Sequence, residues 1–303
     1  MRTVSTPRTE WLAGASRKPK VQWRARRSLD DPHKAIVHPG IGCLGGRPTL
    51  RKMITAGVDL ATEPANTALA TIRWTSGGAS VLSLSLGVDD AGIAEAAQSV
   101  AKLGLDCPLG WPDDFLRFLQ AHQAGRVVAP QDVAGRDWRR RLAYRATDRA
   151  VREVTGLTPL SVAADRIGLT AMRAAGLLAR LANEGRSVDR GGGGIVVEVY
   201  PAASLKCWGL SHKGYKRSVN RDQLAALVRA LLNAAPWLEL GSHADLCAQS
   251  DDAFDAVIAA LTSRAAALSQ TTEPGDTVQR DQARREGWIA LPMGPLSSLA
   301  ANE

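Results

Sequence analysis

The sequence has few aromatic residues, few cysteines and no long apolar run, and each shortage excludes a class of protein. Aromatic residues make up 5% of the 303 residues, while the apolar fraction of 45% is enough for a globular core. No C-x-x-C pair is present, so neither a zinc knuckle nor a disulfide framework is expected from the widely spaced Cys43, Cys107, Cys207 and Cys247. Because the chain shows no membrane-spanning run and no signal-peptide core, we expect a reduced, soluble, cytoplasmic protein.

The net charge of +8 is concentrated at the N-terminus. Residues 1–52 contain twelve Lys or Arg and three Asp or Glu, so this arm carries +9 and the remaining chain is close to −1. We expect the arm to be disordered, and Met53 offers an alternative translation start that would leave it out of the protein. A basic arm can bind phosphate backbones, but a solvated tail has the same composition, so the arm is weak evidence of function.

Three strands are predicted at the start of the body, over Ile54–Leu60, Thr67–Trp74 and Ser80–Leu86. The segments between them are too short to hold a crossover helix, which indicates an antiparallel meander. A helix over Ala91–Leu103 and a short strand over Leu103–Asp106 follow, and Pro108 prevents the strand from continuing.

The rest of the chain alternates helices with one further strand. Residues 113–190 form a predicted helical insert, with a long helix over Ser161–Asn183 and a flexible run of four glycines after it. A fifth strand is predicted over Ile195–Tyr200, and helices over Ala203–Gly209, Arg221–Ala234 and Asp251–Leu268. We therefore expect an α/β fold with a mixed five-stranded sheet in a domain over 53–292, and a loose tail over 293–303.

Acidic residues occur at positions where a carboxylate is costly. Asp59 lies in the first strand, Asp106 ends the fourth, and Glu198 lies in the middle of the fifth. A buried carboxylate needs a counter-charge, hydrogen bonds or a metal ion, and these strands contain no Lys or Arg. A strand face open to solvent is the alternative for Asp59 and Glu198.

The last helix opens with Asp251, Asp252 and Asp255, and its dipole alone favours acids there. Its apolar stripe contains Phe254, Val257, Ile258 and Leu261. At 100° per residue, Asp251 and Asp255 lie beside this stripe and Asp252 points more nearly away, so Asp255 is the best candidate to face the sheet. Three or four carboxylates from separate elements suit Mg²⁺ or Mn²⁺, and two such ions can neutralise the charge that develops during phosphodiester hydrolysis.

The chain resembles the bacterial domain-of-unknown-function family 429, described as predicted nucleases with a ribonuclease H-like fold. The matching segments run in the expected order over about 54–292 and are specific as an ordered set. They are Gly57-Val58-Asp59-Leu60-Ala61, Asp106-Cys107-Pro108-Leu109-Gly110-Trp111-Pro112, Arg145-Ala146-Thr147-Asp148, Glu198-Val199-Tyr200-Pro201-Ala202, Tyr215-Lys216, Asp252-Ala253-Phe254-Asp255-Ala256 and Glu286-Gly287-Trp288-Ile289.

The resemblance implies a ribonuclease H-like fold, a nuclease activity and a nucleic-acid partner. Carried over, it makes Asp59, Asp106, Asp252 and Asp255 metal ligands for one or two Mg²⁺ or Mn²⁺ ions, with Glu198 a further catalytic candidate. Tyr215 and Lys216 could contact a substrate phosphate, although a plain loop fits them equally well. Arg145 and Asp148 are substrate-binding candidates because Arg145-x-x-Asp148 belongs to the family pattern. The basic residues Arg141, Arg145, Arg149 and Arg152 also recur at helical spacing and could hold phosphates; a solvated face with local ion pairs is the alternative.

Three functions compete. A metal-dependent nuclease or related phosphodiesterase is favoured by the acids. An actin-like small-molecule phosphotransferase is disfavoured, because the turn Thr62-Glu63-Pro64-Ala65-Asn66 after the first strand lacks the glycines of a phosphate loop. A non-catalytic binding module that keeps the fold is the third, and its mark would be acids that do not converge in space.

Overall fold

The structure is a computed structural model that describes residues 53–128, 130–131 and 135–300. All of them belong to one compact unit, Arg47–Glu303. The predicted disordered arm, residues 1–52, lies outside the described residues. Within the described residues, no helix is both long enough and apolar enough to cross a membrane.

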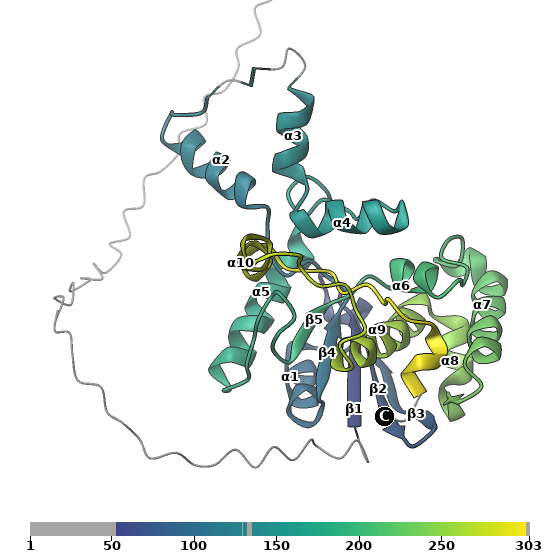
Figure 1. Cartoon of the computed structure of the whole chain (residues 1–303). Helices are drawn as coiled ribbons and strands as arrows, with labels where there is room; N and C mark the ends of the chain where they lie inside the picture. Colours follow the sequence, from purple (N-terminus) through teal and green to yellow (C-terminus); the bar gives the residue numbers. More distant parts are fainter. Residues whose placement is uncertain (1–52, 129, 132–134, 301–303) are drawn as a thin grey trace, which may run out of the picture. The chain divides into compact units, whose positions relative to one another are not determined.

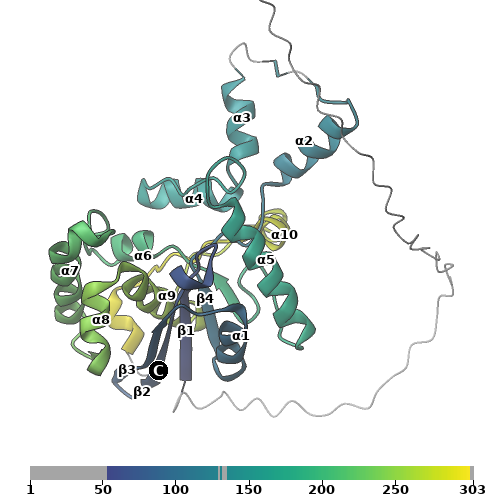
Figure 2. The ribbon, with the colours of Figure 1, turned by 180° about the vertical axis from the view of Figure 1, so that it is seen from behind.

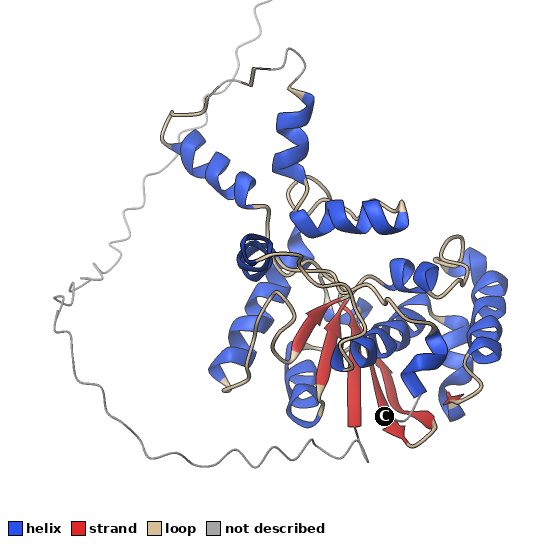
Figure 3. Cartoon of the chain, in the orientation of Figure 1, coloured by secondary structure: helices blue, strands red, loops and turns tan. Residues whose placement is uncertain are grey.

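A mixed sheet of six strands forms the centre of this unit (Figure 3). Its order is β5-β4-β1-β2-β3-β6, with β1, β2 and β3 antiparallel, β4 and β5 parallel to β1, and β6 parallel to β3. The strands are β1 (Met53–Asp59), β2 (Ala68–Thr75), β3 (Gly78–Leu86), β4 (Lys102–Leu105), β5 (Val196–Glu198) and β6 (Leu238–Glu239). The predicted meander is confirmed. The predicted number of five strands is wrong, because a two-residue strand such as β6 leaves no periodicity in the sequence.

Helices cover both faces of the sheet, as Figures 1 and 2 show from opposite sides. They are α1 (Asp90–Ser99), α2 (Asp113–Gln123), α3 (Arg136–Ala143), α4 (Ala146–Thr155), α5 (Gly168–Asn183), α6 (Pro201–Cys207), α7 (Arg221–Ala234), α8 (Ala244–Gln249), α9 (Asp251–Ala267) and α10 (Thr277–Glu286). Short 3-10 turns occupy Pro64–Asn66, Ser218–Asn220, Gly241–His243 and Leu296–Ala300. The insert between β4 and β5 holds α2 to α5, and α2 and α3 stand apart from the strands (Figure 1).

Strand alternation separates the apolar residues into two cores. On β2, Ala68, Ala70, Ile72 and Trp74 pack in one core with α6 to α9, whereas Leu69 packs in the other core with α1 and α5. On β1, Ala56 and Val58 also belong to the core beneath α1 and α5. The intervening residues of β1, and Asp59 with them, therefore face α9.

Helix α9 lies directly on β1 and β4 because two glycines leave room for it. A Cβ on Gly57 would collide with the backbone of Ala256 and Ala260, and one on Gly104 would collide with Ser263 and Ala259. Every residue of α9 from Ala253 to Ala265 is buried. The predicted single apolar stripe was therefore too narrow, since α6, α8 and the chain end cover the side of α9 that faces away from the sheet.

Two sequence expectations about loops and helices need correction. Residues 161–167 form turns, not the first turns of α5, because Ser161 Oγ accepts from the Ala164 amide and Asp165 Oδ2 from the Ser161 amide. The segment after Leu268 is also more ordered than predicted. It holds α10, capped by Asp276, and it places Leu296 and Leu299 in the core beside α9, so residues 293–300 are not a loose tail.

Candidate functional site

Asp59 and Asp106 lie side by side because β1 and β4 are parallel neighbours that end at the same edge of the sheet. Val58 is paired with Leu105, and the Asp106 amide donates to the Val58 carbonyl at 2.9 Å. Because side chains alternate along a strand, both carboxylates point toward α9, on the strand face that also holds Thr55 and Gly57. Both residues are half-buried.

The first turns of α9 add two more carboxylates. Ser250 caps the helix by accepting from the Ala253 amide at 3.2 Å, and Asp255 beyond it is fully buried, with 0% of its surface exposed. Asp252 is half-buried, and its carboxyl group lies close to that of Asp59. The helical wheel, which pointed Asp252 away, was therefore misleading, because this end of α9 meets protein on more than one side.

All four carboxyl groups have a raised pKa, and burial is the largest cause in each. Burial, followed by repulsion from Asp106 and Asp255, raises the pKa of Asp59 well above its ordinary value. Burial raises the pKa of Asp106 to about 7, with Lys216 acting in the opposite direction. Burial also raises the pKa of Asp252 and of Asp255. Carboxylates gathered in this way repel one another, so the site favours protons or a cation.

Tyr215 and Lys216, which the sequence left undecided, both contact Asp255. The Tyr215 hydroxyl donates to Oδ1 at 2.8 Å, and the Lys216 ammonium lies 2.5 Å from Oδ2. Oδ2 is buried and receives no hydrogen bond of regular geometry from the described residues, so the lysine meets it as an ion pair. Burial disfavours the ammonium, but Asp255, Asp106 and Asp59 outweigh this and raise the pKa of Lys216.

These donors suit a hard divalent cation, but their present arrangement is not a ready-made metal site. No group of three or more His, Cys, Asp or Glu side chains among the described residues is placed to hold a metal ion. Two features fit a cation: the carboxyl groups of Asp59 and Asp252, which lie close together, and the buried Oδ2 of Asp255, which the Lys216 ammonium already meets. Carboxylate oxygens are the ligands that Mg²⁺ and Mn²⁺ prefer.

Glu198 belongs to a different group of charges. It alternates with Val197, so it shares the strand face of Val196, which packs in the core under α1 and α5. It is 2% exposed, which excludes the alternative of a solvent-facing position. Arg145 supplies the counter-charge that the strands lack, through bonds from Nη1 to Oε2 at 2.8 Å and from Nη2 to Oε1 at 2.7 Å.

Arg145 and Asp148 are buried in the same network. Arg145 is 1% exposed and also bonds Asp148, from Nη2 to Oδ1 at 2.8 Å. It lies between α3 and α4, so the predicted ridge of arginines is interrupted there. Glu286, to which the sequence gave no role, accepts from the Asp113 and Ala146 amides, and its own carbonyl accepts from Arg145 at 3.0 Å. The Glu286-Gly287-Trp288-Ile289 motif was the available signal. We assign Glu198, Arg145 and Asp148 to holding the insert on the sheet, because every charge is already paired.

A cavity of about 480 Å³ opens beside Asp106. Tyr200, Tyr215 and Lys216 form part of its wall. Its remaining charged lining is the Arg145–Glu198 pair and the basic residues Arg166 and Lys213, and His212 also lines the cavity. A substrate with a negative charge could therefore approach Asp106 through this cavity.

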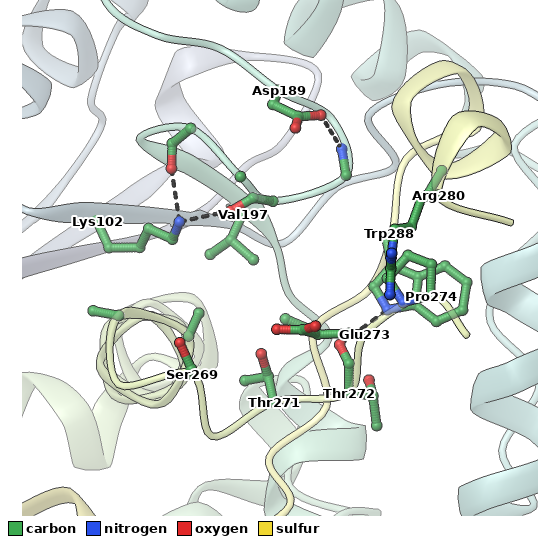
Figure 4. A pocket seen from close by; sticks show the side chains of 18 of the residues that line it. Lys102, Asp189, Val197, Ser269, Thr271, Thr272, Glu273, Pro274, Arg280 and Trp288 are labelled. Carbon is green, nitrogen blue, oxygen red and sulfur yellow. Dashed lines mark hydrogen bonds between the residues drawn. The ribbon is translucent and has the colours of Figure 1, made fainter. Parts of the chain in front are cut away.

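A second cavity, of about 610 Å³, lies at the opposite ends of the same strands (Figure 4). Met53 and Lys102, the first residues of β1 and β4, line it. The Lys102 ammonium donates to the carbonyls of Gly192 and Gly194, each at 2.7 Å, and so ties the glycine run to β4. This cavity is larger, but it contains none of the clustered carboxylates.

Comparison with known proteins gives one match. A search of the curated proteins and a search of the solved structures each found none. The family described as "Protein of unknown function (DUF429)" matches residues 57–279, a span that includes all four clustered carboxylates, Lys216 and most of the Arg145 network. The chain therefore belongs to the DUF429 family.

Proposed function

We propose that this protein is a metal-dependent nuclease or related phosphodiesterase of ribonuclease H-like type. The observation that carries the proposal is the gathering of Asp59, Asp106, Asp252 and Asp255 at the ends of β1, β4 and α9, where each has a raised pKa. A protein that needed these residues only for stability would gain by replacing them, because uncompensated carboxylates in one place repel one another.

The topology supports the ribonuclease H-like assignment. An antiparallel β1-β2-β3 meander continued by parallel β4 and β5, with acids at the end of β1, after β4 and at the start of a late helix, is the arrangement that the resemblance implies. Family membership supports the positions, but the family description names no activity. The assignment of a nuclease activity therefore depends on the carboxylates.

Asp59, Asp106, Asp252 and Asp255 would hold Mg²⁺ or Mn²⁺. A bound ion would supply charge neutralisation at a phosphodiester and a water molecule of lowered pKa. Asp255 is fixed for this role by Tyr215, whose hydroxyl holds one of its oxygens. The basic residues around the cavity beside Asp106, Arg166, His212 and Lys213, would hold the substrate phosphates. We therefore propose nucleic acid as the substrate and partner.

The test is a cleavage assay on the full chain. Single-stranded, duplex and branched DNA and RNA are incubated with Mn²⁺ or Mg²⁺, using wild type, Asp59→Asn and Asp222→Asn, which alters an exposed acid in the first turn of α7. We expect wild type and Asp222→Asn to cleave. Asp59→Asn should not cleave, and EDTA should abolish cleavage by the other two proteins. Cleavage that persists in Asp59→Asn, or its absence on every substrate, contradicts the proposal.

One observation favours the non-catalytic binding module as a second candidate. The acids interact, but they do not surround one point as a ready-made metal site. If the chain binds nucleic acid and Asp59→Asn leaves that binding unchanged while no cleavage is found, this candidate replaces the first. The described residues give no support to the phosphotransferase. The turn after β1 is the 3-10 helix Pro64–Asn66, which lacks the glycines of a phosphate-binding loop.

A further inference from the structure

The segment that carries Lys216 is fastened to the start of α9 by consecutive residues. Tyr215 and Lys216 contact the two oxygens of Asp255, and the Arg217 amide donates to Asp251 Oδ2 at 3.2 Å. Tyr215 is buried and meets the ring of Phe254 edge-on, with centroids 5.9 Å apart. A lysine on an ordinary surface loop has no comparable fixation on both sides.

The backbone at this point is also in an unfavourable conformation. Arg217 has φ +80°, which non-glycine residues rarely adopt, and Gly214 three residues earlier has φ +76°. The Asn220 side chain donates to the Lys216 carbonyl at 2.7 Å and helps to hold the turn. Such strain persists only where surrounding contacts enforce it, and it gathers at functional positions. The contacts that hold this turn therefore also hold the Lys216 ammonium among the carboxylates.

The Lys216 ammonium supplies a positive charge within the carboxylate cluster. Its nitrogen touches the buried Oδ2 of Asp255, and the carboxylates of Asp106 and Asp59 attract it as well. About half of the Lys216 side chain remains exposed, at 52%, so the charge is delivered from the solvent side, next to the cavity beside Asp106.

We infer that the Lys216 ammonium takes the place of one cation in this cluster, so that the carboxylates bind one divalent ion and not two. This inference rests on the proposed function and specifies its metal requirement. Lys216 then contributes a fixed positive charge beside the bound ion, with N–H donors free to meet a phosphate oxygen in the adjoining cavity. The divalent ion would then be held by Asp59, Asp106 and Asp252, and Asp255 would hold the lysine in place of a second ion.

The test counts Mn²⁺ ions in the full-length wild type, Lys216→Met and the control Lys206→Met, which alters an exposed lysine in α6 outside the cavity lining. Equilibrium dialysis gives the stoichiometry. Electron paramagnetic resonance shows whether two bound ions are spin-coupled. Circular dichroism confirms that each variant is folded.

We expect one uncoupled ion in wild type and Lys206→Met, and two coupled ions in Lys216→Met. If wild type binds two ions, or if wild type and Lys216→Met each bind one, the inference is wrong. In both cases the proposed metal site itself stands. No ion in any of the three proteins overturns the proposed metal site itself, and any other stoichiometry overturns the inference.

Discussion

At the scale of single residues, acids that look alike in the sequence belong to two different environments. Glu198 is matched by Arg145 and further bonded by the Leu109 amide, so its charge is satisfied within the fold. Asp59 has acids for neighbours, and Lys216 opposes them. The first environment stabilises the protein, and the second costs stability, as is typical of functional sites.

The first prediction concerns the stability that the fold loses by having a carboxylate at Asp59. Because repulsion and burial raise the pKa of this carboxyl, we expect Asp59→Asn to make the metal-free protein more stable at pH 8, where the charged form is the disfavoured one. Each kcal/mol gained raises the melting temperature of a domain of this size by about 2–4 °C. Thermal unfolding in EDTA measures this, with Asp222→Asn as the control that should not change. A lower melting temperature for Asp59→Asn would mean that Asp59 is a stabilising residue.

The second prediction concerns Arg145. Replacing it with alanine leaves Glu198 and Asp148 buried without their counter-charge, which costs about 3–5 kcal/mol in such networks. Arg149→Ala, at an exposed arginine one turn along, should change the free energy of unfolding by less than about 0.5 kcal/mol. Urea unfolding of the two variants separates the roles. Equal stability with selective loss of nucleic-acid binding in Arg145→Ala would restore the substrate-binding role that the sequence predicted.

At the scale of secondary-structure elements, the site depends on how closely α9 approaches β1. We expect Gly57→Ala to destabilise the fold by more than about 2 kcal/mol, because the new methyl group would meet the backbone of α9 and not a side chain that could move. Gly176→Ala in α5 is the matched control, since nothing lies near its Cβ position, and alanine there should stabilise by about 0.5–1 kcal/mol. Chemical denaturation measures both, and equal stability of the two variants would contradict the packing described.

Elements with a strong period were predictable, and elements fixed by distant partners were not. The meander, α7 and α9 follow from alternation or helical spacing in the sequence, and α7 has the predicted bounds, Arg221–Ala234. Helix α10 was missed because its residues are mostly polar, and β6 because it has two residues. Among the acids, Asp59, Asp106 and Asp255 could be placed from strand ends and helix geometry. The partner of Glu198 could not be predicted, because Arg145 lies 53 positions earlier in the chain.

At the scale of the whole molecule, the acid cluster links the stability of the fold to pH. The pKa of Asp106 is about 7 in the fold and about 4 in the unfolded chain. Between these values the fold keeps the proton that the unfolded chain has released, so the contribution of Asp106 to stability falls as the pH rises from about 4 to 7. We expect the free energy of unfolding of Asp106→Asn, relative to wild type, to increase over this range in EDTA. A difference that does not vary with pH would contradict the raised pKa.

The measurement that tests the central claim most directly is Mn²⁺ binding to the full chain by titration calorimetry at pH 8. Wild type, Asp59→Asn and Asp222→Asn are compared. If the carboxylates form a metal centre, wild type and Asp222→Asn bind Mn²⁺ with the same affinity, and Asp59→Asn binds it at least tenfold more weakly. Binding of equal strength in all three proteins, or none in wild type, would contradict the account.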